Sequence, residues 1–331
     1  MKEPSRRWGE GLGRMLQALG PVLGLAVVLG LFALFPETRA SMFTPASMKL
    51  ILTQTVIVAI AALGMTMVIV SGGIDLSAGS VVALCGVVAA TLAAQGHSLA
   101  AAAAGAVGTG ALLGLLNGSV IAGARMTPFI VTLGSMGIAR GTAKWLADNR
   151  TVNYPRDHPI NSLMARRNLD AVWDLPPGVW VAAGLAIATG LVMSRSVFGR
   201  HVFAVGSSEA AARLCGVRVR WTKLCVYVAA GSCAGLAGLM QASRLNQGDP
   251  SVALGLELEV IAAVVIGGAS LSGGVGSVAG AMVGALIMAV LRSGSGQMDW
   301  PNYVQEITIG AVIILAVWLD RLRNRARVRG G

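Results

Sequence analysis

Charged and aromatic residues are both scarce in this sequence. Of the 331 residues, 12% are charged and 5% are aromatic, whereas 55% are hydrophobic, and the mean hydropathy is +0.70. Soluble globular domains carry about 25% charged residues. A water-soluble fold of this length could not hide so much apolar surface, so the scarcity of charge excludes a soluble protein and indicates an integral membrane protein.

Motifs for catalysis and nucleotide binding are absent. None of the four lysines follows a glycine, so the chain has no G-x-x-x-x-G-K-[ST] phosphate-binding loop. It also has no G-x-S-x-G or H-E-x-x-H motif. We therefore expect no catalytic residues, no metal, no cofactor and no ATPase site in this chain.

The cysteines and histidines show no spacing typical of metal ligands or disulfides. The three histidines lie far apart, and no two cysteines form a C-x-x-C pair. We expect all four cysteines to be small apolar residues packed within helices. They are Cys85, Cys215, Cys225 and Cys233.

A net charge of +11 raises the question of a nucleic-acid partner. Nearly all of the 26 basic residues lie between the apolar runs and at the chain ends, and no aromatic residues alternate with them. Surfaces for base stacking are therefore unsupported. We predict no nucleic-acid binding.

The apolar residues form ten runs, most of them long enough to cross a membrane. About 20 helical residues at 1.5 Å each span the hydrocarbon core. Leu258 to Gly267 is too short to cross alone, so it begins upstream or belongs to a broken helix. We predict an all-α bundle of about ten transmembrane helices, at Leu19 to Phe35, Ile51 to Val70, Ser77 to Ala94, Leu99 to Ala122, Thr127 to Leu146, Gly178 to Ser194, Leu224 to Gln241, Leu258 to Gly267, Val275 to Leu291 and Tyr303 to Leu319.

The first run follows a basic segment, as the apolar part of a signal peptide does. It lacks an A-x-A-like cleavage site and is long for such a peptide. We expect a retained first helix.

The basic residues predict the orientation, because cytoplasmic loops carry the excess of Lys and Arg. With the N-terminus inside the cell, sixteen of the 26 basic residues are cytoplasmic and eight are outside, and Arg140 and Lys144 fall within the fifth run. Both termini are then cytoplasmic, and the arginine-rich tail 321–331 anchors the chain at the anionic leaflet. Residues 1–331 form one transmembrane domain, with an extracytoplasmic loop at 147–175 and a cytoplasmic loop at 195–223.

Glycines recur at G-x-x-x-G spacing in three of the runs. Small residues on one face of a helix let two helix backbones approach closely in lipid. We therefore expect close helix packing at Gly110, Gly114 and Gly118, at Gly231 and Gly235, and at Gly276, Gly280 and Gly284.

Two glycine-rich segments resemble each other. Residues 72–77 read GGIDLS and residues 267–272 read GGASLS, each between two apolar runs and each at the cytoplasmic side of the predicted topology. Duplication and independent convergence on a helix break with a serine cap both explain the likeness.

The cytoplasmic loop contains a short helix with recognisable ends. Ser207 or Ser208 is placed to cap it, the acidic Glu209 lies in its first turn, and Gly216 is placed to end it. A bundle without partners has no need of such a helix. A membrane subunit that docks on a separate ATPase does.

Three further segments carry a resemblance to a known family. They are residues 70–80 (VSGGIDLSAGS), 127–134 (TPFIVTLG) and 257–276, and together they make nearly the whole chain resemble the permease subunits of ribose-type ABC sugar importers. Residues 209–211 look like the coupling helix of ABC permeases. Gly216 stands one residue beyond the E-A-A-x-x-x-G pattern, as fits the sugar branch.

The resemblance implies a function and a set of partners. It implies a monosaccharide importer of the bacterial inner membrane, for ribose or another pentose-like sugar, with a second permease chain, a cytoplasmic ABC ATPase subunit and an extracytoplasmic sugar-binding protein. The ATPase-coupling residues are then Gly206, Ser207, Ser208, Glu209, Ala210, Ala211, Arg213 and Gly216.

Polar residues within membrane helices are costly and are therefore candidates for the substrate pathway. Thr53, Gln54, Thr55 and Asn117 could hydrogen-bond a sugar, although bonding between helices is the commoner explanation. Asp75 follows the Gly-Gly break, where it either caps the next helix, the interpretation we favour, or faces the pathway.

Other functions are less well supported. Within the same class, a permease for branched-chain amino acids or nucleosides is the alternative. An ion-coupled secondary transporter would need acidic residues deep in the bundle, whereas Asp75, Glu257 and Glu259 lie near the ends of runs, and the two glutamates could be paired with Arg244 or hydrated. A passive channel has no visible filter motif.

Overall fold

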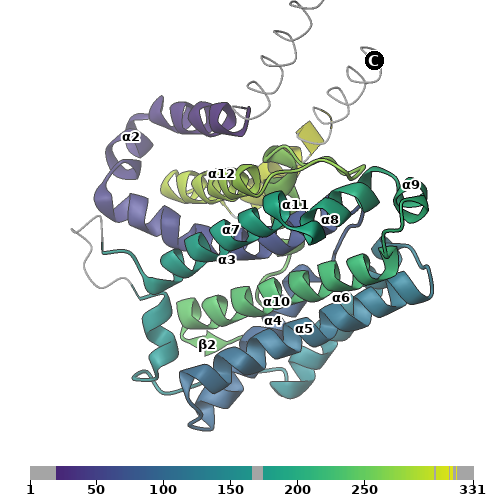
Figure 1. The fold of residues 1–331 in the computed structure, drawn as a ribbon. Coiled ribbons are helices and arrows are strands. Elements are labelled where there is room, and N and C mark those ends of the chain that lie inside the picture. The colour runs from purple at the N-terminus through teal and green to yellow at the C-terminus, as the bar shows by residue number, and fades with distance from the viewer. Residues whose placement is uncertain (1–19, 166–173, 302, 313, 316–317, 319–331) are drawn as a thin grey trace, which may run out of the picture.

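The computed structural model describes residues 20–165, 174–301, 303–312, 314–315 and 318, and these residues are mostly helical (Figure 1). A helix over Gly20–Ala33 comes first. The elements that follow are α2 Pro36–Met42, α3 Pro45–Val70, α4 Ala78–Ala94, α5 Leu99–Gly123, α6 Pro128–Leu146, β1 Val152–Asn153, the 3-10 helix η1 Pro159–Leu163, α7 Pro177–Arg195, α8 Val197–Ser207, α9 Glu209–Leu214, α10 Val219–Leu245, β2 Gln247–Gly248, α11 Leu256–Ile266 and α12 Val278–Gln297. Residues 303–312 are helical again.

Five of these helices are long and apolar enough to cross a membrane. They are α3, α5, α7, α10 and α12. The class of protein, an all-α membrane protein, is therefore confirmed. The number of ten spans stays a prediction, although each of the ten predicted runs coincides with a helix in its described part; Leu19 of the first run and residues 313, 316–317 and 319 of the last run lie outside the described residues.

The helix α3 forms the centre of the bundle. Of its most apolar stretch, 94% is buried, which is typical of a helix that is apolar on all sides and surrounded by protein. It packs between α10 and α12 and also contacts α7 and α11. The helices α4, α5, α6 and α10 form a neighbouring group (Figure 1). Only 22% of the corresponding stretch is buried in α5 and in α7, so these two helices offer apolar faces to lipid or to another chain.

The predicted close packing is confirmed for the glycines that lie within helices, whereas Gly276 lies in the loop before α12, against Val70 and Ala269. The most extensive contact between elements joins α5 to α10. A Cβ atom added at Gly110 would overlap the carbonyl oxygen of Gly231, and one at Gly114 would overlap that of Tyr227. The helices α11 and α12 meet in the same way, because a Cβ at Gly284 would overlap the carbonyl oxygen of Ala263. Backbones therefore touch where a larger residue would separate the helices.

Two expectations about single elements need correction or completion. The short eighth run does begin upstream, at Leu256, but it ends at Ile266, and the chain turns back through a glycine-rich loop into α12.

Cys85 and Cys233 are buried as expected, whereas Cys215 and Cys225 are exposed. Cys215 follows the last turn of α9 and Cys225 lies on an outer face of α10, so neither is packed within the bundle.

Candidate functional site

The short helix α9 has the ends that the sequence predicts. Of the two candidate caps, the structure uses Ser208, whose Oγ accepts a hydrogen bond from the Ala211 amide at 3.3 Å. Ser207 instead ends α8, and its Oγ donates to the Phe203 carbonyl at 2.9 Å. Gly216 follows α9 with φ +81°, in the left-handed region that glycine adopts without strain. Its amide and that of Val217 bond back to α9, which closes the helix end.

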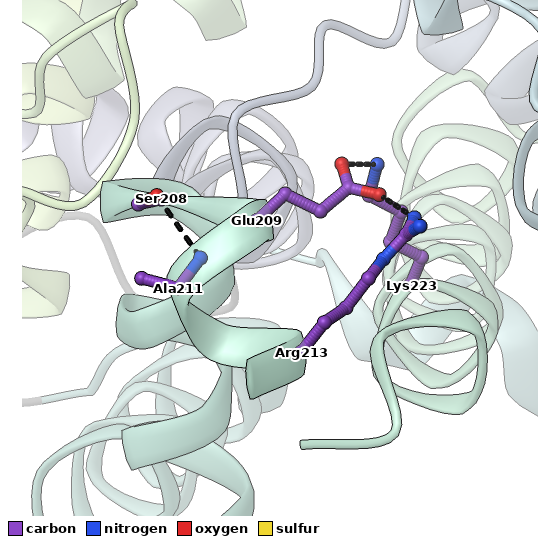
Figure 2. Close-up of polar contacts among 5 residues, drawn as sticks. All are labelled: Ser208, Glu209, Ala211, Arg213 and Lys223. Atoms are coloured by element: carbon purple, nitrogen blue, oxygen red, sulfur yellow. Dashed lines mark hydrogen bonds and ion pairs between the residues drawn. The ribbon is translucent and has the colours of Figure 1, made fainter. Parts of the chain in front are cut away.

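Glu209 holds α9 against the first turns of α10. Figure 2 shows its carboxylate between two cations: Arg213, one turn further along α9, and Lys223 of α10, whose Nζ lies 2.7 Å from Oε2. Hydrogen bonding from Lys223 lowers the pKa of the Glu209 carboxyl, which outweighs the raising effect of partial burial, and Arg213 adds to the lowering. Glu209 is therefore ionised at neutral pH and fixes the orientation of α9.

The rest of α9 faces outward. Ala212 packs with Val205 and Val219 in a small apolar cluster that seats the helix on the bundle. Ala210, Ala211 and Arg213 are exposed, and Leu214 is 90% exposed. An open cavity of about 570 Å³ lies beside Glu209, Ala210, Arg213 and Leu214. The helix therefore presents an apolar, partly basic surface that nothing in the described chain covers.

Four glycines bring three distant segments together next to α9. We call Gly72, Gly206, Gly273 and Gly274 the glycine junction. The Gly274 amide donates to the Val70 carbonyl at 2.9 Å. A Cβ at Gly206 would overlap that same carbonyl oxygen, and a Cβ at Gly273 would stand 2.9 Å from Gly72 Cα. The first of the two similar glycine-rich segments thus meets the residues directly after the second one at the end of α8, which leads directly into α9.

Asp75 and Asn117 belong to one buried network of hydrogen bonds. Asp75 Oδ1 accepts from the amide and the Oγ of Ser77, at 2.8 Å and 2.6 Å, and Asn117 Nδ2 donates to the same Ser77 Oγ at 3.2 Å. Thr132 of α6 joins the network, accepting from the Leu76 amide at 3.1 Å. The favoured role of Asp75 needs correction, because Ser77 holds the N-cap position of α4 and Asp75 forms a turn just before it. The serine cap considered for residues 72–77 is Ser77, whereas Thr132 was not singled out, since a single hydroxyl in an apolar run carries no distinguishing pattern.

The three polar residues of α3 differ in their surroundings. Thr53 and Thr55 donate within the helix, to the carbonyls of Lys49 at 2.7 Å and Ile51 at 2.8 Å. Gln54 Oε1 is buried and has no hydrogen-bond partner in the described chain. Thr53 and Gln54 line a cavity, and the structure therefore separates these two from Thr55 and from the Asp75 network.

An ion pair that the sequence reasoning missed lies near Gln54. Glu259 of α11 is paired with Arg292 of α12, not with Arg244, although Arg244 of α10 is close enough to interact with its charge. The pair joins residues 33 positions apart, and only the antiparallel packing of α11 on α12 brings them together. A sequence pattern gave no sign of it.

Comparisons with known proteins agree with one another. The family model described as "Branched-chain amino acid transport system / permease component" matches residues 47–317. The chain is 36% identical to the ribose import permease protein of Escherichia coli strain K12 over 307 residues, which is 91% of this chain and 93% of the relative. It is 35% identical to the L-arabinose ABC transporter permease protein of Azospirillum brasilense over 324 residues (98% and 93%), and 34% identical to the xylose transport system permease protein of E. coli strain K12 over 359 (91% and 91%). No solved structure matches the chain.

Proposed function

Since this chain belongs to the branched-chain amino acid transport system permease family, we propose that it forms the membrane pathway of an ATP-driven monosaccharide importer. The observation that carries the substrate class is that three relatives covering at least nine-tenths of the chain are permeases named for ribose, L-arabinose and xylose. All three sugars are aldopentoses. A pentose or a similar small sugar is therefore the proposed substrate, ahead of branched-chain amino acids.

The energy comes from a separate subunit. The chain has no phosphate-binding loop of its own, and the surface of α9 is open to a cytoplasmic ATPase. Arg213, Arg218 and Arg220 line a further open cavity beside α9. Acidic residues on the ATPase would complement these arginines, while its apolar residues would cover Leu214.

The glycine junction supports a route from the ATPase to the pathway. α8 and α9 follow each other without a linker, since Ser208 alone separates them. A movement of α9 on the ATPase therefore moves Gly206, which touches both the end of α3 and the loop between α11 and α12. The end of α3 and the loop between α11 and α12 then move together with α8. Their contacts with Gly206 are between backbone atoms, so no flexible side chain takes up the displacement.

The remaining assembly follows from the same proposal. Two permease chains, identical copies in our proposal, enclose one pathway in the bacterial inner membrane, with both termini in the cytoplasm. The segment 147–175 meets an extracytoplasmic sugar-binding protein on the other side. The apolar faces of α5 and α7 meet lipid or the second chain.

Transport in a reconstituted complex tests the proposal. The permease, its ATPase and its binding protein are placed in liposomes, and uptake of labelled D-ribose, D-xylose, L-arabinose and L-leucine is measured with and without internal ATP. We expect ATP-dependent uptake of one of the pentoses and no effect of ionophores. Leucine uptake, or sugar uptake driven by an ion gradient without ATP, would replace this proposal by one of its two alternatives.

A further inference from the structure

We propose that Gln54, Arg244, Glu259 and Arg292 form a contact site for the sugar at the end of the bundle opposite α9. The proposal rests on the function proposed above and adds where, and through which groups, this chain touches its substrate.

The site joins two cavities. One, of about 120 Å³, lies between α3, α10, α11 and α12, and the other, of about 500 Å³, extends past Thr53 toward η1. Gln54, Arg244 and Arg292 line both, so the two spaces adjoin. The larger one falls within the roughly 300–1,000 Å³ of small-molecule sites. The smaller one leads into the bundle along the buried helix α3.

The place of the site along α10 suits entry from outside the cell. Lys223 near the start of α10 holds α9, whereas Arg244 lies at its far end, next to β2 (Figure 1). Arg244 follows Lys223 by 21 residues, which separates the two by about 30 Å along the axis of α10. In the predicted orientation, the site therefore faces the sugar-binding protein while α9 faces the ATPase.

The polar groups at the site are short of partners inside the chain. Gln54 Oε1 is buried and accepts no hydrogen bond from any described residue, and the same holds for Oδ1 of Asn161, which lines the larger cavity. Arg244 makes no hydrogen bond and no close ion pair with another described residue. Buried polar groups are almost always paired in native proteins. Unpaired amide oxygens beside a guanidinium match a ligand whose hydroxyl groups both donate and accept.

The ion pair of Glu259 with Arg292 adds charged groups to the site, and the composition of the site determines how tightly a sugar binds. Glu259 has 8% of its side chain exposed, is paired with Arg292 and lies near Arg244, so the cluster has two positive groups for one negative group. None of the described residues that line the two cavities is aromatic, so this part of the chain offers a sugar ring no flat apolar surface to stack on. We therefore expect the site to recognise hydroxyl groups and to bind the sugar weakly. Weak binding suits transport, because a transported solute must leave each site that it enters.

The variant Gln54→Leu tests the site without breaking an internal contact. Because Gln54 Oε1 has no partner to lose, we expect the thermal stability of the complex to stay at the wild-type value or to rise. Uptake of the transported pentose should fall by about tenfold, the effect of losing roughly one good hydrogen bond to the ligand. ATP hydrolysis stimulated by the loaded binding protein should remain, since α9 and the glycine junction are untouched. Thr55→Val, one residue along in the same helix and facing no part of the site, is the matched control and should transport normally.

An exchange of charges separates a contact site from a structural clamp. Glu259→Gln should reduce uptake, and the double variant Glu259→Arg with Arg292→Glu should regain stability without regaining uptake, because the ion pair returns but the groups offered to the sugar are misplaced. Full recovery of uptake in the double variant, or normal uptake by Gln54→Leu, would overturn the inference. All variants are compared with a wild-type complex that transports a pentose, so that failure of this site is distinguished from failure of the proposed function.

Discussion

At the scale of single residues, Glu209 shows how one charge sets the position of a whole helix. It accepts from Arg213 within α9 and from Lys223 of α10, and it lies at the positive end of the α9 dipole (Figure 2). Removing the charge weakens both contacts, because the hydrogen bonds are no longer charge-assisted on the acceptor side. Reversing it adds repulsion from two cations to the unfavourable dipole.

The substitution Glu209→Lys should therefore release α9 from α10 while leaving the chain inserted in the membrane. We expect the ATPase to fail to co-purify with this variant and uptake to fall to background, with membrane levels unchanged. Glu209→Gln, which removes the charge without reversing it, should show a milder loss. Normal ATPase association of the lysine variant would show that α9 is not the docking surface.

The lowered pKa of the Glu209 carboxyl also makes a prediction about pH. A carboxylate whose pKa is lower in the folded protein than in the unfolded one stabilises the fold above the unfolded value, about 4.5, and loses this effect as the pH falls through the folded value. The wild type should thus have a higher melting temperature than Glu209→Gln at pH 7. The difference should stay constant down to about pH 5 and vanish at lower pH, which thermal unfolding in detergent measures. A difference that grows on acidification would contradict the assigned ion pairs.

At the scale of elements, the glycine junction predicts a separation of ATP hydrolysis from transport. In Gly206→Ala, the added methyl group pushes α8 away from the Val70 carbonyl and from Gly274. We expect the complex to assemble and to hydrolyse ATP at its basal rate, while uptake falls at least about tenfold and the loaded binding protein no longer stimulates hydrolysis.

Gly284→Ala is the matched control for this substitution. Its methyl group meets the Ala263 carbonyl just as closely, but at the contact of α11 with α12 and away from α8. It should lower stability, with uptake and hydrolysis falling in proportion to the amount of folded complex. If in both glycine variants uptake and hydrolysis fall only in proportion to the amount of folded complex, the glycine junction serves helix packing alone and does not couple ATP hydrolysis to transport.

The elements themselves could be predicted from sequence for identifiable reasons. Long continuous runs of apolar residues mark helices because a single helix satisfies all its backbone hydrogen bonds within lipid, and α9 could be predicted because Ser208, Glu209 and Gly216 act on their immediate neighbours. The pairs Glu259 with Arg292 and Gly206 with Gly273 depend on how helices pack, so no local pattern reveals them. For the same reason, Thr53, Gln54 and Thr55 look alike in sequence although only Thr55 lies away from the larger cavity.

At the scale of the whole molecule, the orientation across the membrane is open to a direct test. Cys215 is already exposed at the end of α9, so a variant that keeps it and lacks Cys85, Cys225 and Cys233 carries a natural reporter for that end. In intact cells this thiol should not react with a membrane-impermeant reagent, and it should react once the membrane is opened. A cysteine placed at the exposed Asp157, in a background without native cysteines, should react from outside. Labelling of Cys215 in intact cells would invert the orientation and would place the site around Gln54 on the cytoplasmic side.

The close contact between α5 and α10 also constrains how the protein is made. Gly110 and Gly114 lie against the backbone of α10, yet residues 124–218 are synthesised after α5 and before α10. At about 5–20 residues per second, this delay lasts roughly 5 to 20 seconds. During that time the groove of small residues on α5 is open to any other helix with a matching face. The permease is therefore most exposed to wrong helix pairing, and to quality control in the membrane, while only the first half of the chain has been made.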